Sequence, residues 1–142
     1  MKYDDASWHY GGDFPEGQPD EHGGTHIGLF LKWCFAQGWA GALHTTDAPA
    51  DVAEVVQGTM TGTDFLFRHC DGKFTDEDLT DEGNSFAAQY YGNEGLYLDD
   101  YAEQFGSLMY VAPESAHDYE KFSRMLESRG ATGILAKPKS SS

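Results

Sequence analysis

The chain has 142 residues, the usual size of a single domain. It carries 24 Asp and Glu against 9 Lys and Arg, a formal net charge of −15, so we expect no binding to nucleic acid or to an anionic membrane surface. No apolar run reaches the ~20 residues of a membrane span, and the polar start is not typical of a signal peptide, which predicts a cytoplasmic protein.

Residues 1–25 are predicted to be irregular, because Gly and Pro interrupt them too often for a helix or a long strand. Trp8, Tyr10 and Phe14 favour an ordered loop held to the domain. The clearest helix follows, with Thr25 as its N-cap and Gly38 as its stop. Gly28 should allow close packing near the start of this helix. Its predicted apolar face consists of Ile27, Phe30, Leu31, Cys34 and Phe35.

Shorter helices are predicted along the rest of the chain. Pro49 suits the first turn of a helix over 49–57, and Thr63 is the predicted cap of a short helix carrying Phe65, Leu66 and His69. Thr75 and Asp78 have the spacing of a capping box. Three further helices are expected. The first spans 81–91, with Phe86, Ala87 and Tyr90 inward, and the second spans 97–105, with Leu98, Tyr101 and Phe105 inward. The third runs from Ser115 to a stop at Gly130, with Phe122, Met125 and Leu126 inward.

These elements predict a mainly helical α+β domain of five to six helices spanning residues 1–136. A small sheet is expected from residues 107–112 and 133–136, since both segments are rich in apolar residues. Residues 137–142 read as a disordered tail.

The sequence contains no motif that indicates catalysis. Cys34 and Cys70 both lie among apolar residues and are expected to be buried free thiols. His22 and His26 are four residues apart, but Gly23 and Gly24 separate them, so they would not share a helix face. Nucleophile motifs, phosphate-binding loops and calcium loops are also missing. We therefore predict no catalytic residue, no metal site and no cofactor.

The acidic stretch 71–103 is the best candidate for a binding surface. Lys73 is its only basic residue, and tyrosines lie among its carboxylates. Aromatic anchors inside a charged rim are typical of protein interfaces. The predicted partner-binding residues are Asp76, Glu77, Asp78, Asp81, Glu82, Tyr91, Glu94, Tyr97, Asp99, Asp100 and Glu103.

Several short patterns resemble a family of small, acidic, uncharacterised bacterial domains. They are the run 2–5, then Trp8-His9 with Gly12, Pro15 and Pro19, then the stretch from His26 to Trp33, and later the segments 86–91 and 97–101. Proteins of this kind occur beside secreted-toxin genes. The resemblance implies an immunity function and assigns no functional residue.

The leading hypothesis is an immunity protein that binds a cognate antibacterial toxin, such as a nuclease with a basic cleft, and blocks that cleft. The first alternative is a small metal-dependent hydrolase that uses His9, His22 and His26 with nearby acids. The second is a regulatory module that binds another protein.

Overall fold

The computed structural model describes residues 2–5, 24–91, 96–105 and 116–131. These residues form a mainly helical α+β fold with one small sheet, as the sequence predicts. In chain order the elements are β1 Lys2–Asp5, α1 Thr25–Ala36, α2 Ala42–Asp47, α3 Pro49–Gln57, α4 Gly62–His69, β2 Lys73–Thr75, the 3-10 helix η3 Asp76–Asp78, α5 Asp81–Tyr90, α6 Leu96–Phe105 and α7 Ala116–Ala131. Within the described ranges, none of the helices has the length and apolar character that crossing a bilayer requires.

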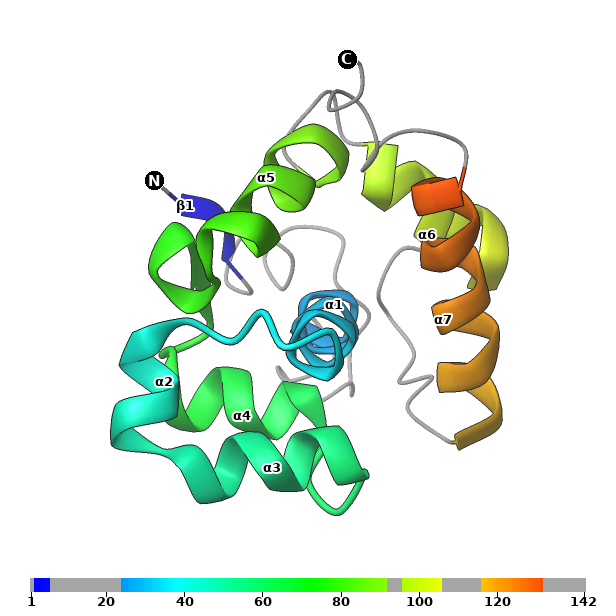
Figure 1. Cartoon of the computed structure of the whole chain (residues 1–142). Helices are drawn as coiled ribbons and strands as arrows, with labels where there is room; N and C mark the ends of the chain where they lie inside the picture. Colours follow the sequence, from blue (N-terminus) through cyan, green and yellow to red (C-terminus); the bar gives the residue numbers. More distant parts are fainter. Residues whose placement is uncertain (1, 6–23, 92–95, 106–115, 132–142) are drawn as a thin grey trace.

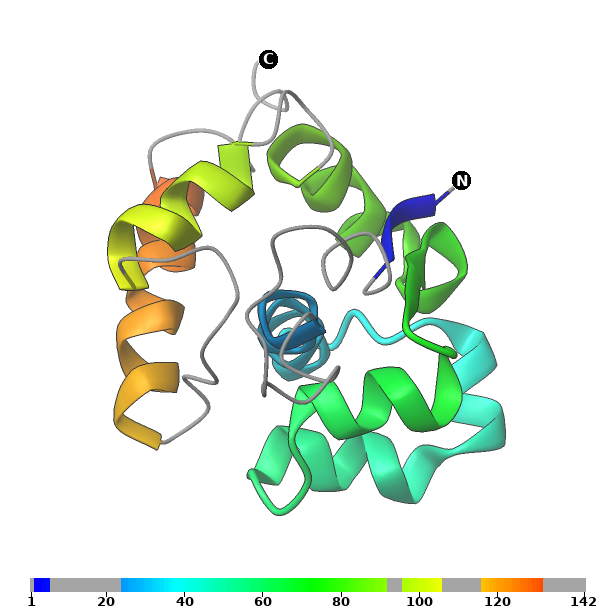
Figure 2. The ribbon, with the colours of Figure 1, turned by 180° about the vertical axis from the view of Figure 1, so that it is seen from behind.

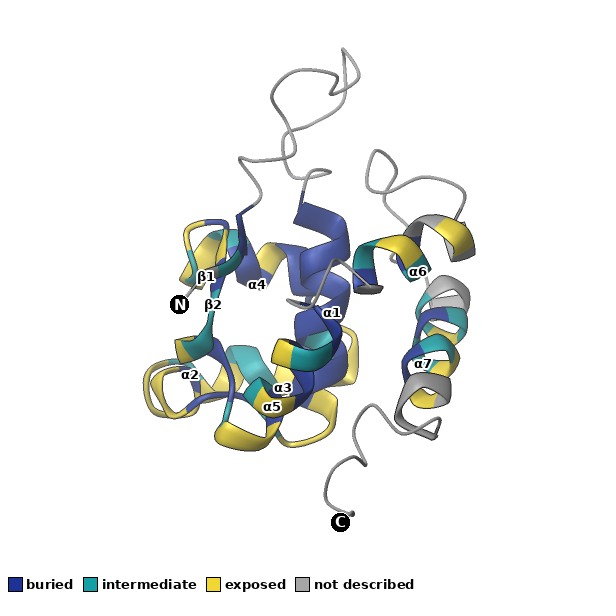
Figure 3. Cartoon of the chain, turned by 90° about the horizontal axis from the view of Figure 1, so that it is seen from above, coloured by how far each residue is buried: buried dark blue, intermediate teal, exposed yellow. Residues whose placement is uncertain are grey.

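Helix α1 forms the centre of the molecule. Seen end-on in Figure 1 and from behind in Figure 2, it lies among the other helices, with α3 and α4 on one side and α7 on another. Ten of its twelve residues are buried, and Figure 3 shows it as an almost unbroken buried element. The sequence predicted one apolar face, but surrounding elements cover this helix on nearly every side.

Two glycines allow α1 and α4 to cross at backbone contact. A Cβ atom added to Gly62 would lie 1.9 Å from the carbonyl oxygen of Gly28, and a Cβ added to Gly28 would lie 2.3 Å from the backbone nitrogen of Thr63. Real side-chain atoms do not approach backbone so closely, so both positions need glycine. The predicted role of Gly28 in close packing is confirmed.

The core is rich in aromatic residues. Phe30 of α1 contacts the rings of Phe74, Phe86, Tyr91 and Tyr97, with centroid distances from 4.9 to 5.8 Å. These rings come from β2, α5 and α6, and from the residue just after α5. The aromatic cluster therefore ties Phe30 of the central helix to rings that lie 44 to 67 residues later in the chain.

The two-stranded sheet of the described residues is formed by segments for which no strand was predicted. Strands β1 and β2 pair antiparallel, with Asp4 opposite Phe74 and Asp5 opposite Lys73. The prediction that all of residues 1–25 are irregular is thus wrong for Lys2–Asp5, because strand pairing with a distant segment outweighs weak local strand propensity. The predicted strands 107–112 and 133–136 lie outside the described residues, as does the tail 137–142.

Most predicted helices are confirmed with small shifts at their ends. Helix α3 has the predicted bounds, and α5 buries Phe86, Ala87 and Tyr90. Helix α1 starts after Gly24 and has no side-chain cap, so the capping role predicted for Thr25 is wrong. Helix α7 continues past Gly130 to Ala131.

Two further differences concern the short helices. The cap of α4 is Thr61, whose hydroxyl accepts from the backbone nitrogen of Asp64, and Thr63 lies inside the first turn. Helix α2 was not predicted at all. It is six residues long with a single buried residue, His44, and so has no apolar periodicity to detect.

Candidate functional site

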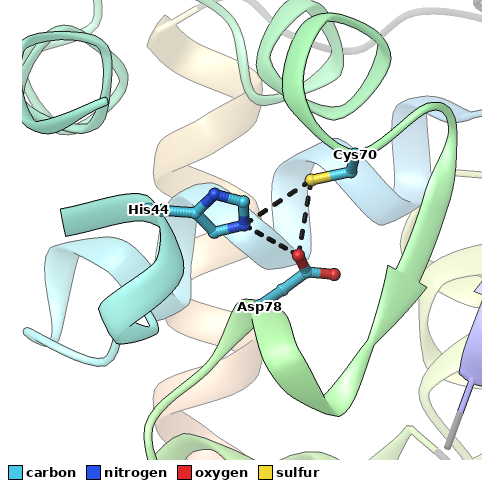
Figure 4. A group of neighbouring side chains, drawn as sticks. All are labelled: His44, Cys70 and Asp78. Carbon is cyan, nitrogen blue, oxygen red and sulfur yellow. Dashed lines mark hydrogen bonds and ion pairs between the residues drawn. The ribbon is translucent and has the colours of Figure 1, made fainter. Parts of the chain in front are cut away.

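Three potential ligand side chains, His44, Cys70 and Asp78, meet where α2, the end of α4 and η3 come together (Figure 4). The Nε2 atom of His44 lies 2.7 Å from Oδ1 of Asp78. The Sγ atom of Cys70 lies 3.7 Å from the same Nε2 and 3.5 Å from the same Oδ1. Among the described residues, this is the one group of three His, Cys or acidic side chains close enough to share an ion.

Backbone pairing brings His44 and Asp78 together. The backbone nitrogen of Gly41 donates to the carbonyl of Asp78 at 2.9 Å, and that of Thr80 donates to the carbonyl of Trp39 at 2.8 Å. A Cβ atom at Gly41 would lie 2.5 Å from the carbonyl oxygen of Glu77, so glycine is required for this approach. The pairing fixes the start of α2 against η3 and sets His44 over Asp78.

A tight turn positions Cys70. This residue is the C-cap of α4, and the chain then reverses through Asp71, with φ of 55°, and Gly72, with φ of 76°. Asp and Gly are residues that tolerate this left-handed backbone. The chain continues from this turn through β2 and η3 to Asp78, eight residues after Cys70, and the carboxylate of Asp78 lies beside the Cys70 thiol.

Asp78 is held by a capping box. Its Oδ2 accepts a hydrogen bond from the backbone nitrogen of Thr75 at 2.8 Å, and the Thr75 hydroxyl accepts from the backbone nitrogen of Glu77 at 3.2 Å. The sequence predicted this box correctly. Because Oδ2 is occupied in this way, Oδ1 is the carboxylate oxygen that faces His44 and Cys70.

The imidazole of His44 is fixed by packing. It is buried and meets the ring of Phe65 edge-on, with centroids 4.9 Å apart and planes at 82°. It also packs near Phe35, at 6.1 Å between ring centroids. The ring is therefore oriented before any ligand arrives.

The Cys70 thiol is not an activated nucleophile. Burial, and then the neighbouring carboxylate of Asp78, raise the pKa of Cys70 well above its ordinary value. The thiol donates its hydrogen to Oδ1 of Asp78. In a proton relay, one imidazole nitrogen faces the carboxylate and the other faces the nucleophile. Here both partners of His44 lie at Nε2, so the geometry suits shared binding of a cation better than relay catalysis.

A cavity opens beside the cluster. It has a volume of about 240 Å³, and Cys70 and Asp78 form part of its wall. A volume of this size exceeds that of several water molecules. The remaining wall residues are Leu43, His69, Asp71, Lys73, Thr75 and Glu77.

A second buried polar group surrounds Asp4. Its Oδ2 lies 2.9 Å from Nε2 of His26 and also accepts a hydrogen bond from the hydroxyl of Tyr91. The hydroxyl of Tyr97 donates to the carbonyl of His26. Burial, and then the carboxylate of Asp4, raise the pKa of Tyr91 well above its ordinary value. This group joins β1 to α1 and to the chain around α5 and α6, which is a structural role.

The structure separates the predicted binding residues into exposed and buried sets. The side chains of Tyr91, Tyr97 and Asp78 are buried, so they offer a partner almost no accessible surface in this structure. Their polar atoms find partners inside the protein, which makes burial favourable. Exposed or partly exposed positions are Asp76, Glu77, Asp81, Glu82, Asp99, Asp100 and Glu103. Glu94 lies outside the described residues.

The histidines considered for the hydrolase alternative do not gain support. His26 is buried, lies against Asp4 and is not among the residues that line the cavity. His9 and His22 lie outside the described residues. The sequence reasoning missed His44 and Cys70 as a pair, and the confirmed capping box at Asp78 was the one local signal of this cluster.

The chain belongs to an uncharacterised protein family. The family model described as Domain of unknown function (DUF7832) matches residues 2–127. Comparisons with curated proteins and with solved structures gave no match. The family assignment agrees with the predicted resemblance to uncharacterised domains and assigns no activity.

Proposed function

We propose that this protein is an immunity protein that binds a cognate antibacterial toxin with a basic surface and blocks it. The observation that carries the proposal is a run of solvent-exposed carboxylates on η3 and the first turn of α5, in a chain of net charge −15. Its members are Glu77, Asp81 and Glu82, and we call them the acidic edge.

Little positive charge opposes the acidic edge. Lys73 is the only Lys or Arg between residues 71 and 103, and its ammonium lies 3.0 Å from Oδ2 of Asp71. On α6, Asp99 and Glu103 are exposed and four residues apart, which places them on one helix face. A surface with this sign attracts basic proteins and repels nucleic acid.

The physical action we propose is electrostatic steering followed by steric occlusion. Complementary charge raises association rates toward 10⁸–10⁹ M⁻¹s⁻¹ at low salt, against ~10⁵–10⁶ without steering. A toxin that acts on nucleic acid needs a basic cleft. An acidic protein that covers such a cleft competes directly with the toxin's substrate.

The first experiment is recovery of the partner, with the intact protein as bait in the source bacterium at low and physiological salt. The proposal requires one secreted effector, bound more weakly as salt rises and inhibited by the purified protein. A recovered partner that has no toxic activity would favour a regulatory binding module instead. An immunity gene is also expected to lie beside its toxin gene.

The second experiment reverses charge on the acidic edge. The triple variant Glu77→Lys, Asp81→Lys and Glu82→Lys should lower the association rate with the toxin at least tenfold at low salt, with the difference shrinking as salt screens it. A matched control is the triple variant Asp47→Lys, Glu54→Lys and Asp64→Lys, which makes the same charge change at exposed positions on α2, α3 and α4. Equal loss in both variants would show that net charge alone matters and that the edge is not the contact surface.

A further inference from the structure

We infer that His44, Cys70 and Asp78 form a transition-metal site, best matched to zinc, whose fourth coordination position opens into the adjacent cavity. The inference goes beyond the proposed immunity function and does not depend on it. The donors are one imidazole nitrogen, one sulfur and one carboxylate oxygen, presented by three separate parts of the fold.

The donor spacing is close to that of a tetrahedral site. Zinc bonds of about 2.0–2.1 Å to nitrogen or oxygen and about 2.3 Å to sulfur place tetrahedral ligands roughly 3.3–3.5 Å apart. The sulfur of Cys70 already lies 3.7 Å from His44 Nε2 and 3.5 Å from Asp78 Oδ1. Only the pair His44 and Asp78, at 2.7 Å, must open, by about 0.6 Å, as the ion replaces their shared hydrogen.

The donor types also match zinc. Thiolate and imidazole are ligands that zinc prefers, and carboxylate completes many of its sites. On binding, the S–H bond of Cys70 breaks, its proton leaves to solvent and an S–Zn bond forms. The imidazole of His44 binds through the lone pair of Nε2 and carries its ring hydrogen on Nδ1, and the Asp78 carboxylate binds through Oδ1. Thiolate and carboxylate together neutralise the charge of the ion, so the burial of this cluster does not oppose binding.

The supporting contacts are those of an oriented metal site. The backbone nitrogen of Thr75 holds the other oxygen of Asp78, and Phe65 fixes the plane of the His44 ring. Groups of this kind set the direction of metal ligands before the ion binds. The lining of the cavity includes both Cys70 and Asp78, which gives an ion a path from solvent.

Three protein ligands with an open fourth position are the arrangement of reactive rather than purely structural zinc sites. In the isolated protein, a water molecule would take the fourth position. His69, Asp71 and Glu77 also line the cavity, so polar groups surround that position. The site could bind a donor from a partner or a small ligand in place of the water.

The test is a titration of the intact, chelator-treated protein with cobalt(II) alone, followed by zinc(II) alone as competitor. We expect one equivalent of cobalt with a near-ultraviolet thiolate-to-metal charge-transfer band, which zinc abolishes. Cys70→Ser should remove the band and weaken zinc binding at least ~100-fold, since even indirect ligand partners contribute 10–100-fold. The matched control is Cys34→Ala, which removes the other thiol and should keep the band.

Each other outcome would overturn the inference. Absence of a thiolate band, a band that survives in Cys70→Ser, or a band lost only in Cys34→Ala would each exclude this site. Because ligand variants can fail to fold, zinc-dependent thermal stabilisation of the unaltered protein gives a second readout, and its absence also counts against the site. Toxin binding by the acidic edge is measured separately, so failure of one proposal leaves the other intact.

Discussion

Removal of the Asp78 carboxylate should destabilise the metal-free protein strongly, and the amount depends on what replaces it. Asp78 accepts from the Thr75 backbone nitrogen, from the His44 ring and from the Cys70 thiol. Asp78→Ala removes the carboxylate that accepts all three of these hydrogen bonds at a buried position. Asp78→Asn keeps the shape and can still accept from Thr75 through its oxygen, while its amide nitrogen donates to the opposite tautomer of His44.

The magnitudes follow from these bonds. Loss of the cap costs ~1 kcal/mol, and a buried imidazole left without its partner costs a further ~1–3 kcal/mol. We therefore expect Asp78→Ala to lower the free energy of unfolding by about 2–4 kcal/mol, which overlaps the cost of breaking a buried pair. Asp78→Asn should lose about 1–2 kcal/mol, because neutral hydrogen bonds replace charge-assisted ones.

The assay is urea unfolding in the presence of chelator, with the change read from the midpoint at constant slope. Glu54→Ala, at an exposed position on α3, is the control and should change stability by less than about 0.5 kcal/mol. Equal stabilities for the Ala variant and the control would refute the cluster geometry. A larger loss for Asn than for Ala would refute the assignment of the two carboxylate oxygens.

Three further predictions concern the packing and the buried ionisable groups. Gly62→Ala should destabilise the protein by about 1–3 kcal/mol in urea unfolding, because the added Cβ would meet the backbone of α1. The cost of this overpacking exceeds the ~1 kcal/mol gain in helix propensity. Unchanged or higher stability would contradict the close crossing of α1 and α4. Burial raises the pKa of both Cys34 and Cys70, so these thiols stay protonated in the folded protein while unfolded thiols ionise. The free energy of unfolding should then fall as pH rises above about 8.5, by up to ~1.4 kcal/mol per pH unit for each thiol. Between about pH 9 and 10, Cys70→Ser should roughly halve this slope. An unchanged slope would place Cys70 in solvent. Tyr91→Phe removes a buried hydrogen bond to Asp4 and should cost about 1–3 kcal/mol by thermal unfolding, whereas a neutral effect would show that this bond is not formed.

Features that depend on residues close in sequence were predictable. The bounds of α3 follow from a proline suited to its first turn and a glycine after its last residue, which has φ of 92°. The capping box of Thr75 and Asp78 follows from a three-residue spacing. In each case the physical cause acts within one helical turn, so the sequence pattern contains all of it.

Features that depend on distant pairing were not predictable in the same way. Strand β1 forms because β2, about seventy residues later, supplies its hydrogen bonds. Four of the predicted partner-binding residues differ in burial, which the sequence did not indicate. Tyr91 and Tyr97 lie in the core, Asp78 points inward, and Asp81 is exposed. Composition alone cannot separate these cases, since an aromatic residue beside acids is compatible with both an interface and a core.

The metal-ligand cluster shows why spacing rules miss some sites. Familiar zinc motifs place paired ligands about three to six positions apart, so they are visible along the sequence. Here the ligands are separated by 26 and 8 residues, and backbone pairing at Gly41 brings the first to the last. Gly41 has no special φ and would read as an ordinary turn residue. Its replacement by Ala should therefore disturb His44 and Asp78 together, which makes an unremarkable glycine the structural link between the two halves of the cluster.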